Sequence, residues 1–438
     1  MRWNTVECTG WGRVHRATSQ VARPERLSTL SATLADTPAP GVGNRRSYGD
    51  ACLNGDGHAV DMTRMDRILS FDRQTGVLEA EAGLTIGALA HVTAPQGWLP
   101  AVMPGTGRAT LGGCAAMDVH GKNHHVAGSF GQHVLSVTLM QGDRRVVATP
   151  NRNKSLFRAT MGGLGQTGVI AQLKLQLKPC PGTVLEVRER RIECFEDFIR
   201  ALDGSQADYV VGWIDAAATG AHLGRGVLEE AQLTRGDTPP RSHSRKVPMD
   251  APGFALSPPV VRLFNAAYYG RIPPGEGRAR TRRIDDFFFP LDKIHDWNRL
   301  YGKRGFHQFQ CVVPLDQVAA LREILVEIAE AHLASPLAVL KRLGPGRAGH
   351  MSFPMEGYTL AVDFPARDGI EALIDQLEQL CRQAGGRLYL AKDALAHGEA
   401  IKAMYSEHGD WVAETAKADP DGAYETDMTR RLTLRSAR

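Results

Sequence analysis

Short apolar runs alternate with glycine-rich turns between residues 40 and 180. The apolar alternation predicts β-strands, bounded by turns. These runs are HAVDM (58–62), RILSF (67–71), VLEAEAG (77–83) and VIAQLKLQLKP (169–179). VLSVTLMQGDRRVVATP (134–150) predicts a hairpin with its turn at Gly142-Asp143. Two segments predict short helices, TIGALAHVTAPQG, which should end at Gly97, and SLFRATMGG (155–163).

After Pro181 the strand-like runs alternate with longer amphipathic segments. The runs that predict strands are TVLEVRERRIECF (183–195), YVVGWIDAAA (209–218), FHQFQCVVP (306–314) and YTLAVDFP (358–365). Those that predict helices are EDFIRALDG (196–204), LDQVAALREILVEIAEAHL (315–333) and GIEALIDQLEQLCRQAGG (369–386). This section predicts an antiparallel sheet with helices on one face. The sequence after Arg387 is polar and helical, and the fold class is therefore α+β.

Length and composition are those of a soluble multidomain enzyme. The 438 residues exceed one compact core, and 43% hydrophobic with 23% charged residues is ordinary. No apolar run is long enough to cross a bilayer, and residues 1–16 lack the apolar region of a signal peptide. We therefore expect a protein that is cytoplasmic or peripheral to the membrane. The seven cysteines form no CxxC pair, which favours buried thiols over a zinc ribbon or a disulfide framework.

The net charge of +4 conceals one strongly basic stretch. Between Arg235 and Arg283 there are ten Lys or Arg and three Asp or Glu, in sequence rich in Pro and Gly. One interpretation is a pair of solvated, mobile loops. The other is a patch that contacts anionic lipid headgroups or a phosphate-bearing substrate, with apolar residues interspersed. No nucleic-acid-binding motif accompanies the charge, so we expect no nucleic-acid partner.

Three glycine-rich segments are candidates for binding a diphosphate: GVGNRRSYG (41–49), GTGRATLGG (105–113) and GGLGQTG (162–168). Glycine allows backbone N–H groups to converge on an anion where a side chain would obstruct them. The third segment contains a GxGxxG match. A predicted helix precedes it and a predicted strand follows it, which is the reverse of the order in a dinucleotide-binding βαβ unit. A Rossmann site is therefore excluded.

Several blocks resemble one flavoprotein class. RSYGD (46–50), PGTGRATLGGCAAMDVHGKNHHVAGSFG (104–131) and GGLGQTGVI (162–170) are similar to the FAD-binding domain of the vanillyl-alcohol-oxidase type. Within that class, the similarity is greatest to oxidases of decaprenylphosphoryl-β-D-ribose, and it continues through FFFPLDKIHDWNRLYG (287–302) and GGRLYLAKD (385–393). The resemblance implies a two-part FAD-binding domain, 1–182 and 387–438, and an antiparallel-sheet cap domain, 183–386, that binds substrate.

The resemblance also implies particular FAD contacts. The loop at 41–51 should surround the diphosphate, and because it contains no histidine we expect the FAD to be non-covalent. The residues that match family flavin contacts are Gly43, Arg46, Ser47, Tyr48, Gly49, Gly105, Thr110, Gly112, Gly113, Met117, His120, Ile170 and Tyr389.

The histidine-rich block MDVHGKNHH (117–125) was considered as a metal site. It has no HExxH pattern, and its glycines indicate an irregular loop, so we predict no metal. His124 and His125 can fill a turn. His120 and Lys122 match family residues at the flavin and substrate faces.

The chemistry implied by the resemblance is oxidation of an alcohol by hydride transfer to flavin N5, which needs a base for the hydroxyl proton. The candidates are Lys392 in YLAKD, Tyr48 and His120; a surface lysine at a strand end is the alternative for Lys392. Gln308 and Gln310 share one face of their predicted strand and suit sugar hydroxyls. The predicted substrate-binding residues are Lys122, Gln308, Gln310, Lys341, as a phosphate contact or a surface lysine, and Lys392.

Two departures from the family pattern bear on the site. The family usually has glycine before the arginine of RSYG, whereas this chain has Arg45. Mycobacterial members have a cysteine facing the pocket in the strand before VDFP, where this chain has Ala361.

The resemblance implies an FAD-dependent oxidase that acts at C2 of a polyprenyl-phosphate ribose. The product is a 2-keto sugar, and a partner short-chain reductase completes the epimerisation to arabinose. The alternative is a soluble sugar-alcohol or aldonolactone oxidase of the same class. A binding protein without chemistry is a third hypothesis, against which the joint presence of Tyr48, His120 and Lys392 counts.

Overall fold

The N-terminal part of the chain forms a small mixed sheet. The computed structural model describes residues 2–237, 239–240 and 243–435. The sheet has the order β1-β2-β4-β3, antiparallel between β1 and β2 and parallel thereafter. Its elements are β1 (Asn4–Thr9), β2 (Arg16–Ala22), α1 (Leu27–Asp36), β3 (Gly41–Val42) and β4 (His58–Asp61). The loop at 43–57 therefore leaves the sheet at the end of β3 and returns at β4.

A second, antiparallel sheet follows, with the order β5-β6-β10-β8-β9 and with β7 paired to β10. Its strands are β5 (Ile68–Asp72), β6 (Val77–Glu81), β7 (Trp98–Pro100), β8 (Val134–Gln141), β9 (Arg144–Ala148) and β10 (Val169–Pro179). The helices in this section are α2 (Ile86–Thr93), α3 (Leu111–Ala116), α4 (His124–Ala127) and α5 (Lys154–Thr160). The hairpin predicted at 134–150 is confirmed, with Gly142 at φ +60° in its turn. The predicted stop at Gly97 is confirmed too, since Gly97 is left-handed after α2 and a short 3-10 turn.

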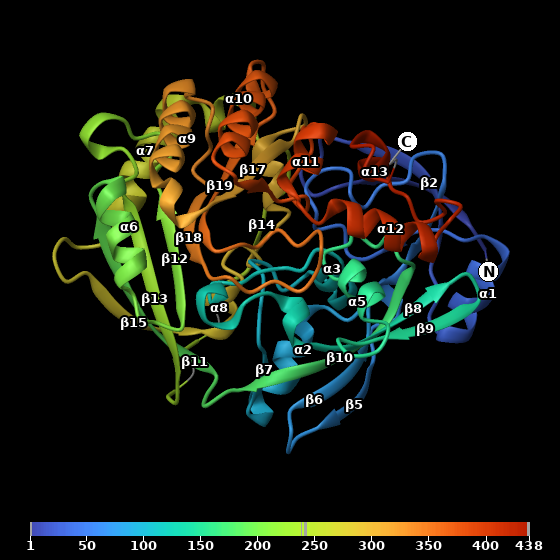
Figure 1. Ribbon diagram of the computed structural model, residues 1–438. Helices are drawn as coiled ribbons and strands as arrows, with labels where there is room; N and C mark the ends of the chain where they lie inside the picture. Colours follow the sequence, from blue (N-terminus) through green and yellow to red (C-terminus); the bar gives the residue numbers. More distant parts are fainter. Residues whose placement is uncertain (1, 238, 241–242, 436–438) are drawn as a thin grey trace.

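An eight-stranded antiparallel sheet forms the other half of the molecule (Figure 1). Its order is β15-β11-β13-β12-β18-β19-β17-β20. The strands are β11 (Val184–Ile192), β12 (Tyr209–Ile214), β13 (Gly226–Thr234), β15 (Arg278–Arg283), β17 (Phe306–Val313), β18 (Ala338–Leu343), β19 (Gly357–Pro365) and β20 (Arg387–Leu388). α6 (Phe195–Gly204), α9 (Val318–Ala331) and α10 (Ile370–Gln383) pack on one face through a large buried apolar cluster. The predicted α+β class, with helices on one face of an antiparallel sheet, is confirmed.

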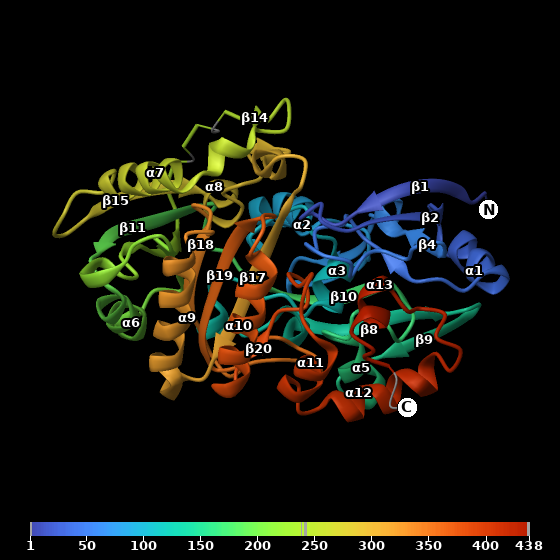
Figure 2. The same cartoon turned by 90° about the horizontal axis from the view of Figure 1, so that it is seen from above.

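The last part of the chain returns to the N-terminal half. Its helices are α11 (Gly398–Met404), α12 (His408–Ala418) and α13 (Asp427–Arg431), and α12 packs against α5 (Figure 2). Arg431 forms ion pairs with Asp50 and Asp393, at 2.7 and 2.8 Å. The Asp427 carboxylate accepts a hydrogen bond from the backbone N–H of Gly55 at 3.0 Å. These bonds fasten the 43–57 loop to the returning segment. The domain boundaries at 182 and 386 stay a prediction.

The interpretation of the basic stretch as loops is wrong for two segments. Residues Pro258–Gly270 form α7, and RARTRR forms the edge strand β15. The prolines and glycines that suggested loops instead flank these elements: Pro258 begins α7, and Gly275 and Gly277, both with positive φ, precede β15. Thr238, Arg241 and Ser242 lie outside the described residues. Two smaller elements complete this region, β14 (Arg245–Lys246), paired with β16 (Ile294–His295), and α8 (Ile284–Phe288).

Three of the four arginines of β15 share one buried carboxylate. Alternation along the strand places Arg278, Arg280 and Arg282 on one face, where each pairs with Glu189 of β11. Arg271 joins the same carboxylate at 3.0 Å, and the Glu189 side chain is fully buried. The three β15 guanidinium groups are therefore largely committed to a structural cluster. Among the described residues, no helix is both long and apolar enough to cross a bilayer.

Candidate active site

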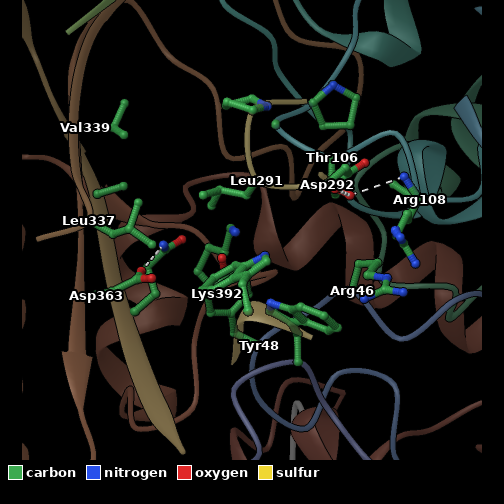
Figure 3. Close-up of a pocket in the computed structure, with 18 of the residues that line it drawn as sticks. Arg46, Tyr48, Thr106, Arg108, Leu291, Asp292, Leu337, Val339, Asp363 and Lys392 are labelled. Carbon is green, nitrogen blue, oxygen red and sulfur yellow. Dashed lines mark hydrogen bonds between the residues drawn. The ribbon is translucent and has the colours of Figure 1, made fainter. Parts of the chain in front are cut away.

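A cavity of about 1240 Å³ lies between the glycine-rich loops and the face of the eight-stranded sheet opposite α6, α9 and α10. Ligand pockets are usually ~300–1,000 Å³, so this cavity has room for a large cofactor together with a substrate. Its wall contains residues from the 41–52 loop, the 103–122 segment, the cap sheet and the returning segment at 389–392. Figure 3 shows side chains from these separate segments converging on the same space.

The cap side of the wall is one face of the sheet. Strand register places alternate residues of neighbouring strands side by side, as for Gln310 with Ala361 and Gln308 with Asp363. The cavity-lining residues of this face are Gln308, Gln310, Thr359, Ala361, Asp363, Val339, Lys341, Val211, Trp213, Glu229, Arg280 and Arg282. The face is thus polar at β17 and β19, apolar at β12, and charged at β13 and β15. The predicted sharing of one face by Gln308 and Gln310 is confirmed.

The loop at 41–52 offers donors to an anion. Among the described residues, the backbone N–H groups of Asn44 to Ser47 have no acceptor in the protein. The buried Nε atoms of Arg45 and Arg46 are also without partners, and Arg108 lines the same cavity. Successive free N–H groups together with guanidinium groups are typical of a phosphate site. These residues fit the diphosphate of FAD.

The backbone at Arg45, where the resemblance led us to expect glycine, has a left-handed conformation. Its φ is +48°, in the left-handed region that glycine adopts without strain. The backbone here therefore has a conformation suited to the glycine of the relatives, and Arg45 takes it at a small energetic cost. Its guanidinium group lies 3.8 Å from the Asp61 carboxylate.

Three of the predicted flavin residues do not line the cavity. The Gly112 N–H donates to Ala82 O at 2.8 Å, and Ile170 is buried in β10 opposite Leu139. A Cβ atom on Gly49 would lie 2.0 Å from the backbone oxygen of Asp393, so glycine is needed for the close approach of the returning segment. The other predicted flavin residues lie on the wall: Gly43, Arg46, Ser47, Tyr48, Gly105, Thr110, Gly113, Met117, His120 and Tyr389.

Lys392 and Tyr48 are in contact in the cavity wall, and His120 lines the same cavity. The Lys392 Nζ lies 3.6 Å from the centroid of the Tyr48 ring, and the Tyr48 N–H donates to Ala391 O at 3.0 Å. Burial raises the pKa of Tyr48 well above its usual value and lowers that of Lys392. Burial, with a smaller effect from Lys341, also holds the pKa of His120 well below its usual value. His120 and Tyr48 are therefore neutral near pH 7.

His120 is oriented by the cap. Gln310 Nε2 lies 3.2 Å from His120 Nε2 and donates to it when the imidazole is neutral. In that arrangement the proton resides on Nδ1, which is buried and has no partner among the described residues. His120 Nδ1 is therefore available to donate a hydrogen bond to a bound molecule. The neighbouring histidines have other roles, since His124 Nδ1 accepts from Gly344 N and His125 bonds Ala207 O, both at 3.0 Å.

Two further lysines bring positive charge to the cavity. The Lys122 Nζ donates to Phe287 O and lies 3.9 Å from the Phe287 ring centroid. Burial lowers the pKa of Lys122 to about 8. The pKa of Lys341 is lowered to about 7, mainly by burial and to a smaller extent by repulsion from Lys122 and Lys392. Within the described part of the chain, the Lys341 ammonium has neither an ion-pair nor a hydrogen-bond partner.

The structure adds two acidic residues that sequence reasoning missed. Asp292 accepts from Thr106 Oγ1 at 2.7 Å and from Gly107 N at 2.8 Å, which ties the cap to the 105–113 loop (Figure 3). No local signal marks this contact, because its partners lie about 185 positions apart. Asp363, on β19, is buried beside Lys392 and lines the cavity. A single acid in the apolar run YTLAVDFP was a signal that could have identified it.

One group of metal-ligand types lies outside the cavity. His350, Glu407 and Asp410 bring three possible ligand atoms within 4.8 Å of one another. Glu407 already forms ion pairs with Arg158 and Arg347, at 2.5 and 2.6 Å. The carboxylate is thus occupied by guanidinium groups, and the group has a structural explanation.

The comparisons with known proteins show the family. An FAD binding domain family model matches residues 19–150. The decaprenylphosphoryl-β-D-ribose oxidase of Mycolicibacterium smegmatis is 35% identical, with 98% of each chain covered. An uncharacterized protein in the mprA 5′ region of Streptomyces coelicolor is 32% identical, over 80% of this chain and 100% of that one. An L-gulono-1,4-lactone dehydrogenase of Mycobacterium tuberculosis is 21% identical, over 95% of this chain and 96% of that one. The chain therefore belongs to the family of FAD-dependent oxidoreductases that includes decaprenylphosphoryl-β-D-ribose oxidase.

Proposed function

We propose that this FAD-dependent oxidoreductase oxidises C2 of a polyprenyl-phosphate ribose to the 2-keto sugar, as the first half of an epimerisation to arabinose. The observation that carries the proposal is the position of the unpartnered Lys341 ammonium. It lies on the same sheet face as Gln308 and Gln310 and near the three candidate catalytic groups. A sugar that bears a phosphate offers hydroxyls to the amides and an anion to the ammonium.

Each of the residues near Lys392 has its own proposed role in the oxidation. Bound FAD supplies the hydride acceptor, flavin N5. Lys392 is the proposed base for the hydroxyl proton, since burial lowers its pKa toward neutrality and a neutral amine can accept a proton. Tyr48 is unsuited to that role because burial raises its pKa, but its ring holds the lysine in place. Gln310 orients His120, whose Nδ1–H can donate to the flavin or the sugar.

The substrate phosphate is proposed to bind Lys341 and Lys122. Lys122 and Lys392 lower the pKa of Lys341, and neighbouring cations of this kind are costly in a partly buried site unless an anion joins them. An anionic ligand removes that cost. A free pentitol or an aldonolactone has no phosphate and leaves the Lys341 ammonium without an anion, and the soluble-oxidase alternative therefore explains less of the site.

The mouth of the cavity is suited to a lipid tail. Leu256, Val260 and Phe264 line the cavity, and the last two are 41% and 50% exposed. Further exposed apolar side chains nearby in sequence are Met249 at 69%, Phe254 at 72% and Leu263 at 73%. We propose that these side chains contact the membrane and the prenyl chain. This apolar contact is separate from the one expected from the β15 arginines, three of which pair with Glu189.

An isotope experiment tests the position of oxidation. Farnesylphosphoryl-ribose with deuterium at C2 is turned over by the purified holoenzyme, and the product is examined by mass spectrometry. We expect the product to lose the C2 deuterium and the flavin reduction rate to show a primary isotope effect. A product that retains the deuterium places the oxidation at another carbon. A short-chain reductase added with a reduced nicotinamide cofactor should then convert the keto sugar to the arabinose epimer.

A further inference from the structure

Asp363 is a buried acid at the reacting end of the cavity for which FAD binding and phosphate binding give no role. It lies on β19 and is 1% exposed. Its backbone is fixed on both sides, because its N–H donates to Leu337 O at 3.0 Å and its carbonyl accepts from Ser335 N at 2.8 Å. The carboxylate therefore has a defined position on the cavity wall, close to Lys392 (Figure 3).

Two side chains fix the orientation of this carboxylate. Gln308 Nε2 donates to Oδ1, and the Tyr301 hydroxyl donates to Oδ2 at 3.2 Å. The Tyr301 hydroxyl is itself held by Ser335 Oγ at 2.9 Å. Among the described residues the carboxylate has no direct ion-pair partner. A buried charge without one is costly, and an asparagine amide could accept from Gln308 through its oxygen and donate to the Tyr301 hydroxyl through its NH2 group. The hydrogen bonds alone therefore do not account for an acid here.

The charge of Asp363 acts on Lys392. Burial raises the pKa of Asp363 to about 7, while the hydrogen bond from Gln308 and then the positive charge of Lys392 oppose that rise. The negative charge is therefore gained as pH rises through about 7. The other ionisable groups that face Lys392 come from the 41–52 loop, the 117–125 block and β18. Tyr48 and His120 are neutral near pH 7, and Lys341 carries positive charge, which repels the ammonium. Asp363 is thus the acid in this set that stabilises a protonated Lys392.

We propose that Asp363 is a positioning residue whose negative charge, when the carboxyl is ionised, raises the affinity of the Lys392 amine for the substrate hydroxyl proton. The inference rests on the proposed role of Lys392 as base. In the reaction the O–H bond breaks as its proton passes to the amine, and the C–H electron pair leaves with its hydrogen as hydride to the cofactor. The ammonium formed is stabilised by the carboxylate across the cavity wall. With no charge at position 363, Lys392 is a weaker base.

The test measures Lys392 directly, without substrate. The FAD-loaded wild type and the variants Asp363→Asn, Asp363→Glu and Tyr301→Phe are treated with acetic anhydride across a pH series. Acylation at Lys392 is quantified by peptide mass spectrometry, since only the neutral amine reacts. Loss of a nearby opposite charge typically shifts a pKa by ~1–3 units, so the Asn variant should reach half-maximal acylation at least about one pH unit lower. The Glu variant should restore the wild-type midpoint.

The tyrosine variant separates charge from structure. Tyr301→Phe removes a hydrogen bond from Oδ2 and leaves the carboxylate in place, so its midpoint should stay within a few tenths of a pH unit of the wild type. An Asn variant with the wild-type midpoint, a Phe variant that shifts as far as the Asn variant, or equally slow acylation in all four proteins overturns the proposal. Flavin reduction by farnesylphosphoryl-ribose, measured separately, tests the proposed substrate, and its failure leaves the acylation result interpretable.

Discussion

Lys392 is buried in the cavity wall, unlike an ordinary surface lysine. Its ammonium lies against the Tyr48 ring in a wall that also contains His120 and Asp363, and burial lowers its pKa. The YLAKD motif indicated the residue, but its surroundings could not be read from the sequence. Tyr48 and Asp363 lie 344 and 29 positions away along the chain. Residue identity was thus accessible to sequence reasoning, whereas the electrostatic environment depends on the fold.

Replacing Lys392 should separate chemistry from cofactor binding. We expect Lys392→Met to retain FAD, because the free amides at 44–47 are untouched. Anaerobic flavin reduction should fall ~10²–10⁴-fold, the usual loss on removal of a general base. Lys417→Met is the matched control, because the Lys417 side chain is 71% exposed and pairs with Glu414 on α12. A Lys392 variant that reduces its flavin at the wild-type rate would remove the base assignment.

Lys341 should control affinity in a pH-dependent way. Its pKa of about 7 means that the ammonium is present below that pH and is lost as pH rises through it. We therefore expect the KM for farnesylphosphoryl-ribose to increase above pH 7, with a smaller change in kcat. A hydrogen bond to a charged group contributes ~1.5–3 kcal/mol, so Lys341→Met should raise the KM about 10- to 100-fold at pH 6. An unchanged KM, or the same pH dependence in the variant, contradicts the phosphate assignment.

At the scale of elements, the apolar and polar pattern predicted the long strands and helices well. β10, the 134–148 hairpin, α9 and α10 have strong periodicity and were identified directly. β15 and α7 were missed because RARTRR and PPVVRLFNAAYYG were interpreted through their Pro, Gly and Arg content. Whether three arginines can form an edge strand depends on Glu189, which lies on β11, about 90 positions earlier in the sequence. That partner is visible only in the fold.

The Glu189 cluster should be important for stability. Removing one partner of a buried ion pair costs ~3–5 kcal/mol. Because the arginines are partly exposed, we expect the lower end of that range, so Glu189→Gln should lower the free energy of unfolding by about 3 kcal/mol. Urea unfolding measures this, with Glu186→Gln on the exposed face of β11 as control. Burial alone would raise the pKa of Glu189, but the arginines, Arg282 foremost, hold it below its usual value. Its contribution is therefore present above the unfolded-state pKa and is lost as pH falls through the folded-state pKa. Equal stability of the two variants would contradict this account.

At the scale of the whole molecule, a cavity between two sheet-based halves opens next to exposed apolar side chains. The sequence indicated a basic contact with membranes, which stays a prediction. In the fold three β15 arginines pair with Glu189, and Phe254, Leu263 and Phe264 are exposed. The loops at 41–52 and 103–122 that fit FAD belong to the opposite half. Membrane contact and flavin binding should therefore be separable.

The apolar rim should govern partitioning onto vesicles. Fully burying a large apolar side chain contributes ~1.5–3 kcal/mol, so the triple change of Phe254, Leu263 and Phe264 to Ser should reduce binding to phosphatidylglycerol-containing vesicles by more than tenfold. The flavin spectrum should be unchanged. Leu69→Ser is the control, because Leu69 is 43% exposed on β5, far from α7 (Figure 1). Vesicle sedimentation that is identical for the triple variant and the wild type would remove the membrane contact from the account.

The most direct test of the central claim is anaerobic reduction of the protein's own flavin by defined substrates. The purified protein should be yellow, and acid precipitation should release the FAD into the supernatant. Mixed without oxygen, farnesylphosphoryl-ribose should bleach the visible flavin band in a stoichiometric titration, whereas free pentitols and aldonolactones should leave it unchanged. Bleaching by the free polyols or lactones, with none by the phosphoryl sugar, would contradict the account and identify a soluble sugar oxidase instead.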